Sequence, residues 1–457
     1  MSYFQAIQQL NAMTPELHTQ PGQPRRKFSL EEIGTLLEAL GNPHHQFRSV
    51  LIAGTNGKGS TASTLASILN ASGLRSGLYT SPHLVRPNER IRVRGIDIRD
   101  DDFARHFHRV VETGNQLVAE QKLPQLPSFF EVLTAMAFLH FAEESVDLAV
   151  LEVGMGGRLD ATNIVSPLLS IVTDISLDHT EWLGPTISAI AREKAGIMRP
   201  NGTLITLPQH PEANQVLGEV AVELNVRGVS AVPYMPQMSA AHGSDQGAYT
   251  IEALGSTVRV NSPLHGAHQH RNVALAVAAA VELAEQHAFS ITTAAIEEGI
   301  YATRWPARLE TLLSGNTQWI LDVAHNPAGA WALRSALRTG FDIGEPGNAP
   351  ATLVFSCLKD KPVDELAHIL FPLFERVIFA PIASPRATLD ADLLAAAESV
   401  GVSAIVASSM TQALALAAEP ARIEEPNTPR KVVVAGSVYL VGQARALLLA
   451  PVPELKA

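Results

Sequence analysis

Short runs of Val, Ile and Leu alternate with Ala-rich, helix-like stretches along most of the chain. This alternation is typical of a mainly parallel sheet with helices on both faces. The apolar runs predict strands at 50–53, 148–153, 168–172 and 203–206 in the first two thirds of the chain, and at 319–323, 352–355, 376–380, 403–406 and 431–435 in the remainder. We therefore expect an α/β protein with a large N-terminal sheet and a second, smaller doubly wound domain.

The length of 457 residues exceeds the size at which one hydrophobic core stops growing, so we expect two domains. Residues 225–262 are rich in Gly, Ser, Pro and Met, which predicts loops and small antiparallel strands, and an Ala-rich helix is expected at 270–286. The segment Arg304-Trp305-Pro306-Ala307-Arg308 is interpreted as a hinge. The predicted domains are residues 1–302 and 303–457.

The segment Ala53-Gly54-Thr55-Asn56-Gly57-Lys58-Gly59-Ser60 lies between a predicted strand and the helix-like residues 61–70. Its glycines let several backbone N–H groups point at one anion, the helix adds its positive N-terminal end, and Lys58 adds a full charge. In the commonest nucleotide loop, G-x-x-x-x-G-K-[ST], a glycine would replace Ile52 and the hydroxyl would come at Gly59 instead of Ser60. The segment nevertheless predicts a nucleoside triphosphate site on a sheet of the P-loop ATPase type.

The charge balance argues against nucleic acid as a partner. The chain carries 45 Asp plus Glu against 34 Lys plus Arg, a net charge of -11, whereas nucleic-acid binders expose a basic surface. The single cysteine, Cys357, excludes an internal disulfide and fits a reducing compartment. No apolar run approaches membrane-spanning length, so we expect a cytoplasmic protein without a membrane partner.

Polar residues follow the predicted strands, where ligands gather in open α/β sheets. Glu152 ends an apolar run immediately before Gly154, Gly156 and Gly157, which suggests close backbone approach and a carboxylate available to Mg²⁺. Ser81, in a Ser-Pro pair, is read from its neighbours as a turn residue. His179 is read as a capping or hydrogen-bonding residue, because a histidine suits zinc better than magnesium.

Three charged segments further along the chain are read from their local pattern. The charges at 192–194 ordinarily form a solvated helix face. Arg308, beside the hinge, either grips phosphate oxygens or forms an interdomain ion pair. The sequence Asp322-Val323-Ala324-His325-Asn326-Pro327 follows a predicted strand and is a second candidate site.

Taken together, these motifs resemble those of the folylpolyglutamate synthases. The matching segments, in order, are GTNGKGS, SPHL, LEVGMGGRLDATN, SLDHTEWLG, REKAGI, HGAHQHRNVALA and LDVAHNP, so the resemblance covers residues from about 50 to 437. GTNGKGS alone would also suit the related Mur ligases of cell-wall synthesis, whereas LEVGMGGRLDATN, REKAGI and LDVAHNP are more specific. The late hydroxyl at Ser60 is then the family's own version of the phosphate loop.

The resemblance implies a role for each matching residue. The ATP phosphates would be held by Gly57, Lys58, Gly59 and Ser60, and other parts of ATP by Asn272, Arg308 and Asp322, with His325 beside them. Magnesium, expected as two ions, would be organised by Ser81, Glu152 and His179, and Lys194 would be carbamylated. The dihydropteroate site would comprise Ser128, Phe129, Phe130 and Glu131 together with Leu159, Asp160 and Ala161. One bifunctional pattern has Thr-Tyr-Phe-Glu where this chain has Ser128-Phe129-Phe130-Glu131.

The implied reaction adds L-glutamate to dihydropteroate and to tetrahydrofolate at the expense of ATP, through an acyl phosphate, in a monomeric enzyme. Lys58, Lys194 and His325 are the expected catalytic residues, and His325 is a hypothetical base for the amine of glutamate. Two alternatives stay open at this point. One is a Mur-type ligase acting on a nucleotide-sugar carboxylate, and the other is a regulatory module that hydrolyses ATP without ligation.

Overall fold

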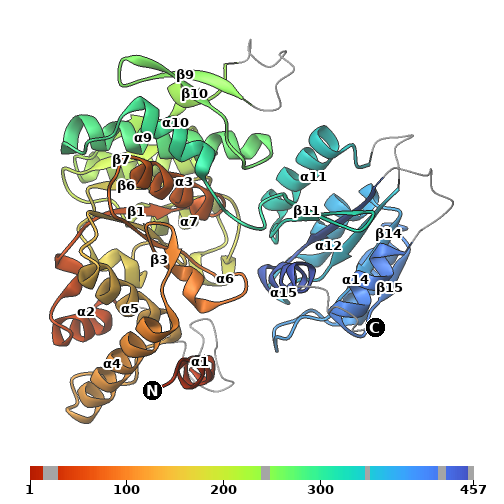
Figure 1. The fold of residues 1–457 in the computed structure, drawn as a ribbon, viewed down its shortest axis with the longest axis horizontal. Coiled ribbons are helices and arrows are strands. Elements are labelled where there is room, and N and C mark those ends of the chain that lie inside the picture. Colours follow the sequence, from red (N-terminus) through yellow and green to blue (C-terminus); the bar gives the residue numbers. More distant parts are fainter. Residues whose placement is uncertain (14–28, 238–247, 345–349, 420–428, 451–457) are drawn as a thin grey trace, which may run out of the picture. The chain divides into compact units, whose positions relative to one another are not determined.

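The computed structural model describes residues 1–13, 29–237, 248–344, 350–419 and 429–450 (Figure 1). The chain divides into two compact units: unit 1 comprises residues 1–83, 87–263 and 270–304, and unit 2 comprises residues 84–86, 264–269 and 305–457. The main division falls between Arg304 and Trp305, inside the segment interpreted as a hinge. Residues 84–86 and 264–269 group with unit 2, although the sequence placed them in the first domain.

Unit 1 is built on an eight-stranded sheet in the order β4-β3-β2-β5-β1-β6-β7-β8. The strands are β1 (Arg48–Ala53), β2 (Ser76–Tyr79), β3 (Ile91–Val93), β4 (Ile96–Asp97), β5 (Leu148–Glu152), β6 (Leu169–Val172), β7 (Thr203–Thr206) and β8 (Arg227–Ser230). Neighbouring strands from β2 to β8 in this order are parallel, whereas β3 pairs antiparallel with both β2 and β4. The four predicted strands are confirmed.

The strands that the pattern did not predict are short or polar. β2, β3 and β4 are four, three and two residues long, too short for a clear period. β8 lies inside the stretch 225–262 that was predicted as loops and small antiparallel strands, and it pairs parallel with β7 instead. The antiparallel part of that prediction is confirmed by β9 (Tyr249–Ala253) and β10 (Ser256–Val260), while residues 238–247 lie outside the described residues.

Helices cover both faces of the unit 1 sheet. Successive side chains of β1 point to opposite faces, so this strand contributes to the core on each side. Leu51 and Ala53 belong to the core under one set of helices, and Val50 and Ile52 belong to the core under another. The first set is α1 (Tyr3–Ala12), α2 (Leu30–Ala39), α4 (Asp100–Ala119), α5 (Phe129–Glu143), α7 (Ile187–Ala195) and α8 (Pro211–Glu223). The second set is α3 (Lys58–Ala71), α9 (Ala267–His287) and α10 (Thr293–Ala302). The helix predicted at 270–286 is α9.

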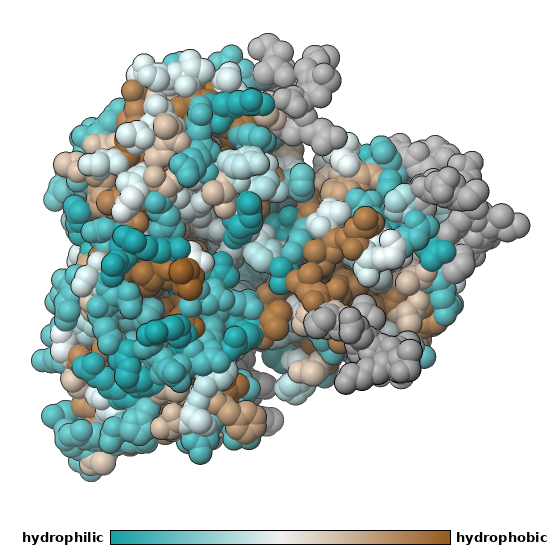
Figure 2. Space-filling model, viewed as in Figure 1, coloured by the Kyte–Doolittle hydropathy of each residue, from teal (hydrophilic) through white to brown (hydrophobic). Residues whose placement is uncertain are grey.

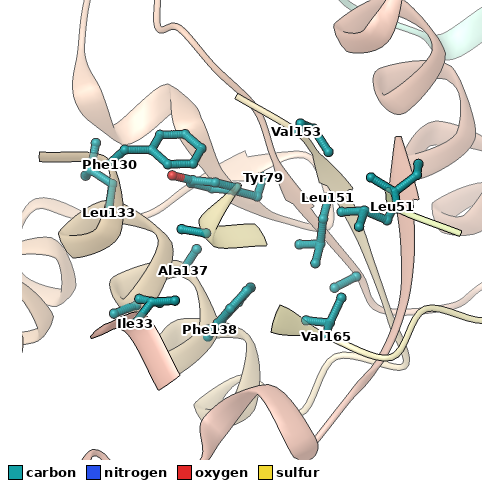
Figure 3. Packing of buried hydrophobic residues seen from close by; sticks show 14 of the residues in the cluster. Ile33, Leu51, Tyr79, Phe130, Leu133, Ala137, Phe138, Leu151, Val153 and Val165 are labelled. Carbon is teal, nitrogen blue, oxygen red and sulfur yellow. The ribbon is translucent and has the colours of Figure 1, made fainter. Parts of the chain in front are cut away.

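The core between β2, β5 and α5 is aromatic (Figure 3). The rings of Tyr79, at the end of β2, and Phe130, in the first turn of α5, have centroids 5.8 Å apart. The Tyr79 hydroxyl lies 3.1 Å from the hydroxyl of Thr134, which satisfies both groups although they are buried. Leu151 and Val153 of the β5 region belong to the same core. This packing fixes the end of β2 and the beginning of α5, the two places that lead into predicted site residues.

Unit 2 has a six-stranded sheet in the order β11-β12-β16-β13-β14-β15. The strands are β11 (Glu310–Ser314), β12 (Thr317–Leu321), β13 (Ala351–Phe355), β14 (Arg376–Phe379), β15 (Ala404–Val406) and β16 (Arg430–Ala435), and the helices are α11 (Pro327–Phe341), α12 (Val363–Leu370), α13 (Asp390–Ser399), α14 (Met410–Ala418) and α15 (Val438–Leu449). All pairs are parallel except β11 with β12. The five predicted strands are confirmed, and β11 is an additional edge strand. The expectation of a second α/β unit, doubly wound and of the Rossmann-like kind, is therefore confirmed.

Hydrophilic side chains cover most of the face of unit 1 that is seen in Figure 2. The apolar residues of the sheets and helices are gathered beneath such surfaces in cores on both sides of each sheet. Over the described ranges, none of the helices combines the length and apolar character needed to cross a bilayer.

Candidate functional site

The strand order of unit 1 brings the predicted site segments to one edge of the sheet. β2, β5, β1 and β6 are adjacent and parallel, so their carboxyl ends meet there. β1 leads into the phosphate loop, β5 ends at Glu152, β2 leads to Ser81, and β6 leads to residues 173–179. The expectation that the polar ends of these strands cluster is therefore confirmed.

The phosphate loop passes directly into a helix. α3 begins at Lys58, three residues before the predicted start, and its N-cap is Gly57 with a φ of 88°. That left-handed conformation favours glycine, and a methyl group on Gly57 would also overlap the side-chain amide of Asn272. Gly59 and Ser60 are buried in the first turn of α3. Unpaired N–H groups of a first helical turn favour an anion, as the sequence predicted.

The segment after β6 holds the phosphate loop in place. The Thr173 hydroxyl donates to the carbonyl oxygen of Asn56 at 2.7 Å, and the Thr55 hydroxyl donates to the carbonyl oxygen of Ser176 at 3.0 Å. The N–H of Ser176 donates back to the Thr55 hydroxyl at 3.1 Å. These contacts span more than one hundred residues of sequence, so sheet order, not local pattern, fixes the shape of the loop.

Lys194 is buried beside the phosphate loop, so its reading as part of a solvated face is wrong. Its side chain is 4% exposed, and Nζ donates to the carbonyl oxygen of Gly54 at 2.8 Å. The Lys58 Nζ donates to the same oxygen at 3.1 Å. Burial, followed by the charge of Lys58, lowers the pKa of Lys194 to about 7, while Asp178 and Asp160 oppose this shift. A substantial fraction of the Lys194 amine is thus neutral, and therefore nucleophilic, near neutral pH.

The glycines after β5 permit close packing within the protein. A Cβ on Gly154 would lie 2.6 Å from the Phe130 ring, and a Cβ on Gly157 would lie 2.7 Å from the carbonyl oxygen of Glu193 in α7. The close approach that the sequence suggested is therefore made to α5 and α7. This packing brings Lys194, the neighbour of Glu193, next to the end of β5.

Ser81 and Glu152 meet at the edge of the sheet. Glu152 is 4% exposed and its Oε2 accepts a hydrogen bond of 3.1 Å from the backbone N–H of Ser81. A buried carboxylate beside a hydroxyl residue is a donor set that suits Mg²⁺, which prefers oxygen. Among the described residues, no three or more His, Cys, Asp and Glu side chains are grouped as a metal site. Of the three metal ligands implied by the resemblance, Ser81 and Glu152 are therefore the two that a hydrogen bond brings together.

His179 has an unusual backbone conformation for a histidine. Its φ is 49°, in the left-handed region, and it is the N-cap of the short helix α6 (Thr180–Leu183). Its N–H donates to Asp178 Oδ1 at 2.9 Å. The helix start agrees with the capping position read from the sequence, although no side-chain capping bond forms. Positive φ in a non-glycine residue is often retained at functional sites.

Ser128 and Glu131 form a capping box at the start of α5. The Ser128 N–H donates to Glu131 Oε2 at 2.7 Å, and the Glu131 N–H donates to Ser128 Oγ at 3.3 Å. Phe129, between them, is half-buried, and the guanidinium of Arg90 lies 5.2 Å from its ring centroid. Of the four residues implied by the resemblance, Phe129 thus keeps a partly accessible aromatic ring, whereas Phe130 is buried in the core.

Asp160 organises the loop that contains Leu159 and Ala161. Its Oδ2 accepts from the N–H of Met155 at 3.0 Å, and its Oδ1 accepts from the N–H and the hydroxyl of Thr162 at 3.0 and 2.6 Å. Burial raises the pKa of Asp160, and these hydrogen bonds oppose the shift. Leu159 is half-buried and Ala161 is buried. The carboxylate therefore shapes the loop from within.

In unit 2, Asp322 holds the segment that carries Arg308. Its Oδ2 accepts from the N–H of Leu309 at 3.0 Å and its Oδ1 accepts from the N–H of Ala324 at 2.9 Å. The residues on either side of Arg308, Ala307 and Leu309, have φ values of 57° and 51°. Such strained conformations persist only where surrounding contacts enforce them. Arg308 is thereby presented in a fixed place on unit 2.

The imidazole of His325 is oriented by the backbone. Its Nδ1 lies 2.8 Å from the carbonyl oxygen of Val323. Because a carbonyl only accepts, Nδ1 carries the hydrogen, and Nε2 is the nitrogen able to accept a proton in the neutral ring. His325, Asp322 and Arg308 all belong to unit 2, whereas the other predicted site residues belong to unit 1.

Two residues outside the predicted set also contact the site. Asp174 follows β6 and Arg271 precedes Asn272, and their side chains form an ion pair with a shortest distance of 2.6 Å. The sequence offered only weak signals for them, a carboxylate after a strand and a cation beside a residue implied in ATP binding. Neither signal distinguishes a site residue from a solvated charge.

Comparison with known proteins gives matches over both units. Residues 52–280 match the Mur ligase middle domain, and residues 307–438 match the Mur ligase glutamate ligase domain. The chain is 35% identical over 420 residues to the folylpolyglutamate synthase of Lacticaseibacillus casei, which covers 91% of this chain and 93% of the relative. It is 36% identical over 385 residues to the dihydrofolate synthase/folylpolyglutamate synthase of Bacillus subtilis, with 81% and 85% covered.

Solved structures agree in fold over nearly the whole chain. The Mycobacterium tuberculosis folylpolyglutamate synthase complexed with ADP and AMPPCP superposes with a TM-score of 0.84 at 33% identity, covering 98% of each chain. An FPGS-AMPPCP-folate complex superposes with a TM-score of 0.81 at 30% identity, covering 98% of this chain and 100% of the other. The similarity thus extends to both units.

Proposed function

The chain belongs to the Mur ligase family and, within it, to the folylpolyglutamate synthases, and we propose on this basis that it is an ATP-dependent ligase. It joins L-glutamate to dihydropteroate, which forms dihydrofolate, and to the γ-carboxylate of tetrahydrofolate. The observation that carries the proposal is the pairing of a Gly-rich phosphate loop with a buried lysine, Lys194, on the carbonyl oxygen of Gly54. Relatives named for both activities match most of this chain.

In this proposal ATP is held from unit 1 by the first turn of α3 and by Lys58. The helix start offers N–H groups and a partial positive charge, with the Ser60 hydroxyl beside them. Asn272 contacts the loop at Gly57. Arg308 and Asp322 are the proposed ATP residues of unit 2, where the guanidinium would bind phosphate oxygens and the carboxylate keeps the Arg308 segment in place.

Ser81, Glu152 and His179 would hold magnesium in this proposal. The oxygen donors of Ser81 and Glu152 suit this ion. Bound magnesium would neutralise charge on the phosphates of ATP. The chain's own contribution is a buried carboxylate whose position is fixed by the Ser81 N–H.

We further propose that Lys194 is carbamylated. The protonated amine first loses a proton, and addition of CO₂ to the neutral amine then forms an N–C bond and releases a second proton, which leaves an oxygen-donor anion. Beside Lys58, this change replaces repulsion between two cations that share the Gly54 carbonyl with attraction between opposite charges. The lowered pKa of Lys194 favours the modification, because only the neutral amine reacts.

The pteroate part of the substrate is assigned to the segment around Phe129 and to the loop of Leu159, Asp160 and Ala161. An accessible aromatic ring can stack on a flat heterocycle. Ser128 and Glu131 contribute by holding the first turn of α5, and Asp160 contributes by shaping its loop. In this reading the capping and loop contacts position the binding surface.

The reaction proceeds in two steps. A substrate carboxylate oxygen first attacks the γ-phosphorus of ATP, and ADP leaves. The uncharged amine of glutamate then attacks the acyl carbon, and phosphate leaves as the amide forms. Lys58 and Arg308 would stabilise charge on the transferring phosphoryl group. His325, through Nε2, is the proposed acceptor of the amine proton, since Val323 holds Nδ1 as a donor.

One assay tests the ligase proposal against its alternatives. The protein is incubated with ATP, Mg²⁺ and L-glutamate, and with dihydropteroate, tetrahydrofolate or a nucleotide-sugar carboxylate in separate reactions, and products are measured by mass spectrometry while ADP is followed. A gain of one glutamyl mass with each folate substrate is the expected result. ADP release without any adduct would instead indicate a regulatory ATPase, and glutamylation confined to a nucleotide-sugar substrate would indicate a Mur-type ligase.

The same proposal includes a cytoplasmic, monomeric enzyme. A buried Cys357 thiol that forms no disulfide is compatible with a reducing compartment. The monomeric state stays a prediction, and light scattering coupled to size exclusion would measure it.

A further inference from the structure

Arg271 connects three segments of unit 1. It lies in the first turns of α9, immediately before Asn272. Its Nε donates to both carboxylate oxygens of Asp174, at 2.9 and 3.0 Å, and its Nη2 donates to Asp174 Oδ1 at 2.6 Å. Nη2 also donates to the carbonyl oxygen of Pro208, after β7, at 3.0 Å. The planar guanidinium therefore fixes both the distance and the orientation of the Asp174 carboxylate.

Asp174 contacts the phosphate loop through its backbone. Its carbonyl oxygen accepts from the N–H of Thr55 at 2.8 Å and from the N–H of Asn56 at 3.3 Å. Asn56 and Asp174 form an isolated antiparallel bridge. One residue thus binds the phosphate loop with its carbonyl and α9 with its carboxylate.

The residue after Arg271 touches the phosphate loop directly. The buried amide of Asn272 lies so close to Gly57 that a methyl group there would overlap it. Two consecutive residues of α9 therefore determine where the loop lies, one through Asp174 and one at Gly57. Any shift of α9 relative to β6 would move the loop and Asn272 together.

We propose that the Asp174–Arg271 ion pair positions the phosphate loop and Asn272 for ATP, an inference that rests on the proposed ligase function. Arg271 and Asp174 act through Thr55, Asn56 and Asn272, and are positioning residues. Their side chains are 28% and 42% exposed, and half-exposed ion pairs contribute little to stability. Removing the pair should therefore affect ATP binding more than folding, because the loop would no longer be preorganised.

The test compares Asp174→Asn, Arg271→Gln and the double variant with the wild-type protein. We expect each to raise the KM for ATP about tenfold, with the KM values for the folate substrate and glutamate within about twofold. The double variant should resemble the single variants, because each already removes the pair. Arg271→Lys keeps the charge without the two-nitrogen contact and should fall between Arg271→Gln and the wild type.

Glu219→Gln is the matched control. It removes the Arg192–Glu219 ion pair, which has a distance of 2.9 Å and side chains 56% and 47% exposed, without a contact to the loop. Its KM for ATP should equal that of the wild type, and thermal denaturation should show all variants within about 2 °C of it. An unchanged KM for ATP in both single variants would overturn the inference. So would equal increases in all three KM values, or a lowered Tm that accounts for the loss.

Calorimetric titration with AMPPCP separates this inference from the ligase proposal, because the titration needs no product formation. We expect the affinity for AMPPCP to fall about tenfold in Asp174→Asn and severalfold in Arg271→Lys. Failure of the wild-type protein to glutamylate a folate would contradict the ligase proposal alone. Equal AMPPCP affinity in wild type and variants would contradict the positioning role alone, even if Arg271→Gln did not fold.

Discussion

The amine of Lys194 donates a 2.8 Å hydrogen bond to the carbonyl oxygen of Gly54. This contact joins α7 to the phosphate loop, and the amine of Lys58 shares the same acceptor. Burial of Lys194, followed by the charge of Lys58, favours loss of a proton from its amine. A residue that reads as a surface charge in sequence is in this way turned into a candidate for modification by CO₂.

Carbamylation of Lys194 should depend on pH. With a pKa of about 7, the neutral fraction of the amine is about 10% at pH 6 and about 90% at pH 8, so carbamate should be sparse at the lower pH and abundant at the higher. Because the pKa is lowered, the amine loses its proton within this pH range, and the carbamate should increase as the pH rises. ¹³C NMR with labelled bicarbonate measures the carbamate signal. Lys194→Ala should lack the signal and the ligase activity.

Short carboxylates such as acetate should partly restore activity to Lys194→Ala, since they replace the missing anion. Lys359→Ala, in unit 2, is the control for nonspecific loss of a lysine. Full activity of Lys194→Ala without any added carboxylate would rule out a role for the modification. Absence of a carbamate signal in the wild type at pH 8 would contradict the modification, and Lys194 would then act only through its contact with the phosphate loop.

Gly57→Ala should weaken ATP binding at least about tenfold, because the new methyl group overlaps the Asn272 amide and α3 must shift. Calorimetry with AMPPCP measures the affinity. Gly73→Ala is the matched control, since Gly73 has a similar φ of 81° but no heavy atom within 4 Å of the place that a Cβ would take. Both variants carry backbone strain of about 1–2 kcal/mol, and only Gly57→Ala should lose affinity. Equal AMPPCP affinities of the Gly57→Ala and Gly73→Ala variants would contradict a functional role for the close contact between Gly57 and Asn272.

Glu152→Gln should raise the Mg²⁺ concentration needed for half-maximal activity by about tenfold or more. The amide still accepts from the Ser81 N–H but no longer supplies a negative charge to the ion. Activity is measured over a Mg²⁺ titration at fixed ATP. Glu144→Gln, at a half-exposed ion pair with Arg75, should leave the titration unchanged. If Glu152→Gln titrates like the wild type, this carboxylate is not part of the magnesium site.

His325→Ala should slow amide formation about 100-fold while acyl-phosphate formation continues. Rapid-quench measurement of ADP and glutamyl product separates the two steps. His368→Ala provides a close control, because Nδ1 of His368 also contacts a backbone carbonyl, that of Asp364 at 2.7 Å, on the exposed side of α12. Glutamate addition at the wild-type rate under saturating substrate would exclude His325 as the base.

Ser128→Ala should lower the free energy of unfolding by about 1 kcal/mol, because it removes the acceptor of the Glu131 N–H at the start of α5. Urea denaturation followed by circular dichroism measures the change. Ser128→Thr retains the hydroxyl and should remain close to the wild type. A Ser128→Ala protein as stable as the wild type would show that the capping box contributes little.

The strands and glycine loop could be predicted because their signals are local. An apolar run of four to six residues indicates a buried strand, and glycines followed by Lys58 indicate an anion-binding helix start. The bounds of short strands such as β2 could not be predicted for the same reason, since four residues do not establish a period. The end of β2 nevertheless places Ser81 next to Glu152, and these two residues are 71 positions apart in the sequence.

The individual site residues required knowledge of their neighbours. Lys194 reads as part of a solvated helix face and Asp174 only as a carboxylate after a strand, until strand order places both beside the phosphate loop. The resemblance to the folylpolyglutamate synthases pointed to Lys194 but not to Asp174 or Arg271. The burial of Lys194, which is 4% exposed, could not be predicted from neighbouring residues in the sequence. It depends on the packing of α7 against the glycine loop after β5.

By itself the sequence determined the α/β class and the phosphate loop, since each follows from patterns among residues close in the chain. Tertiary structure alone decided that Lys194 meets Gly54 across 140 residues and that Arg271 meets Asp174 across 97. The physical reason is that hydrophobic periodicity specifies which face of a strand is buried but not which strand lies beside it. Strand order fixes those neighbours, and with them the charges and pKa values of the site.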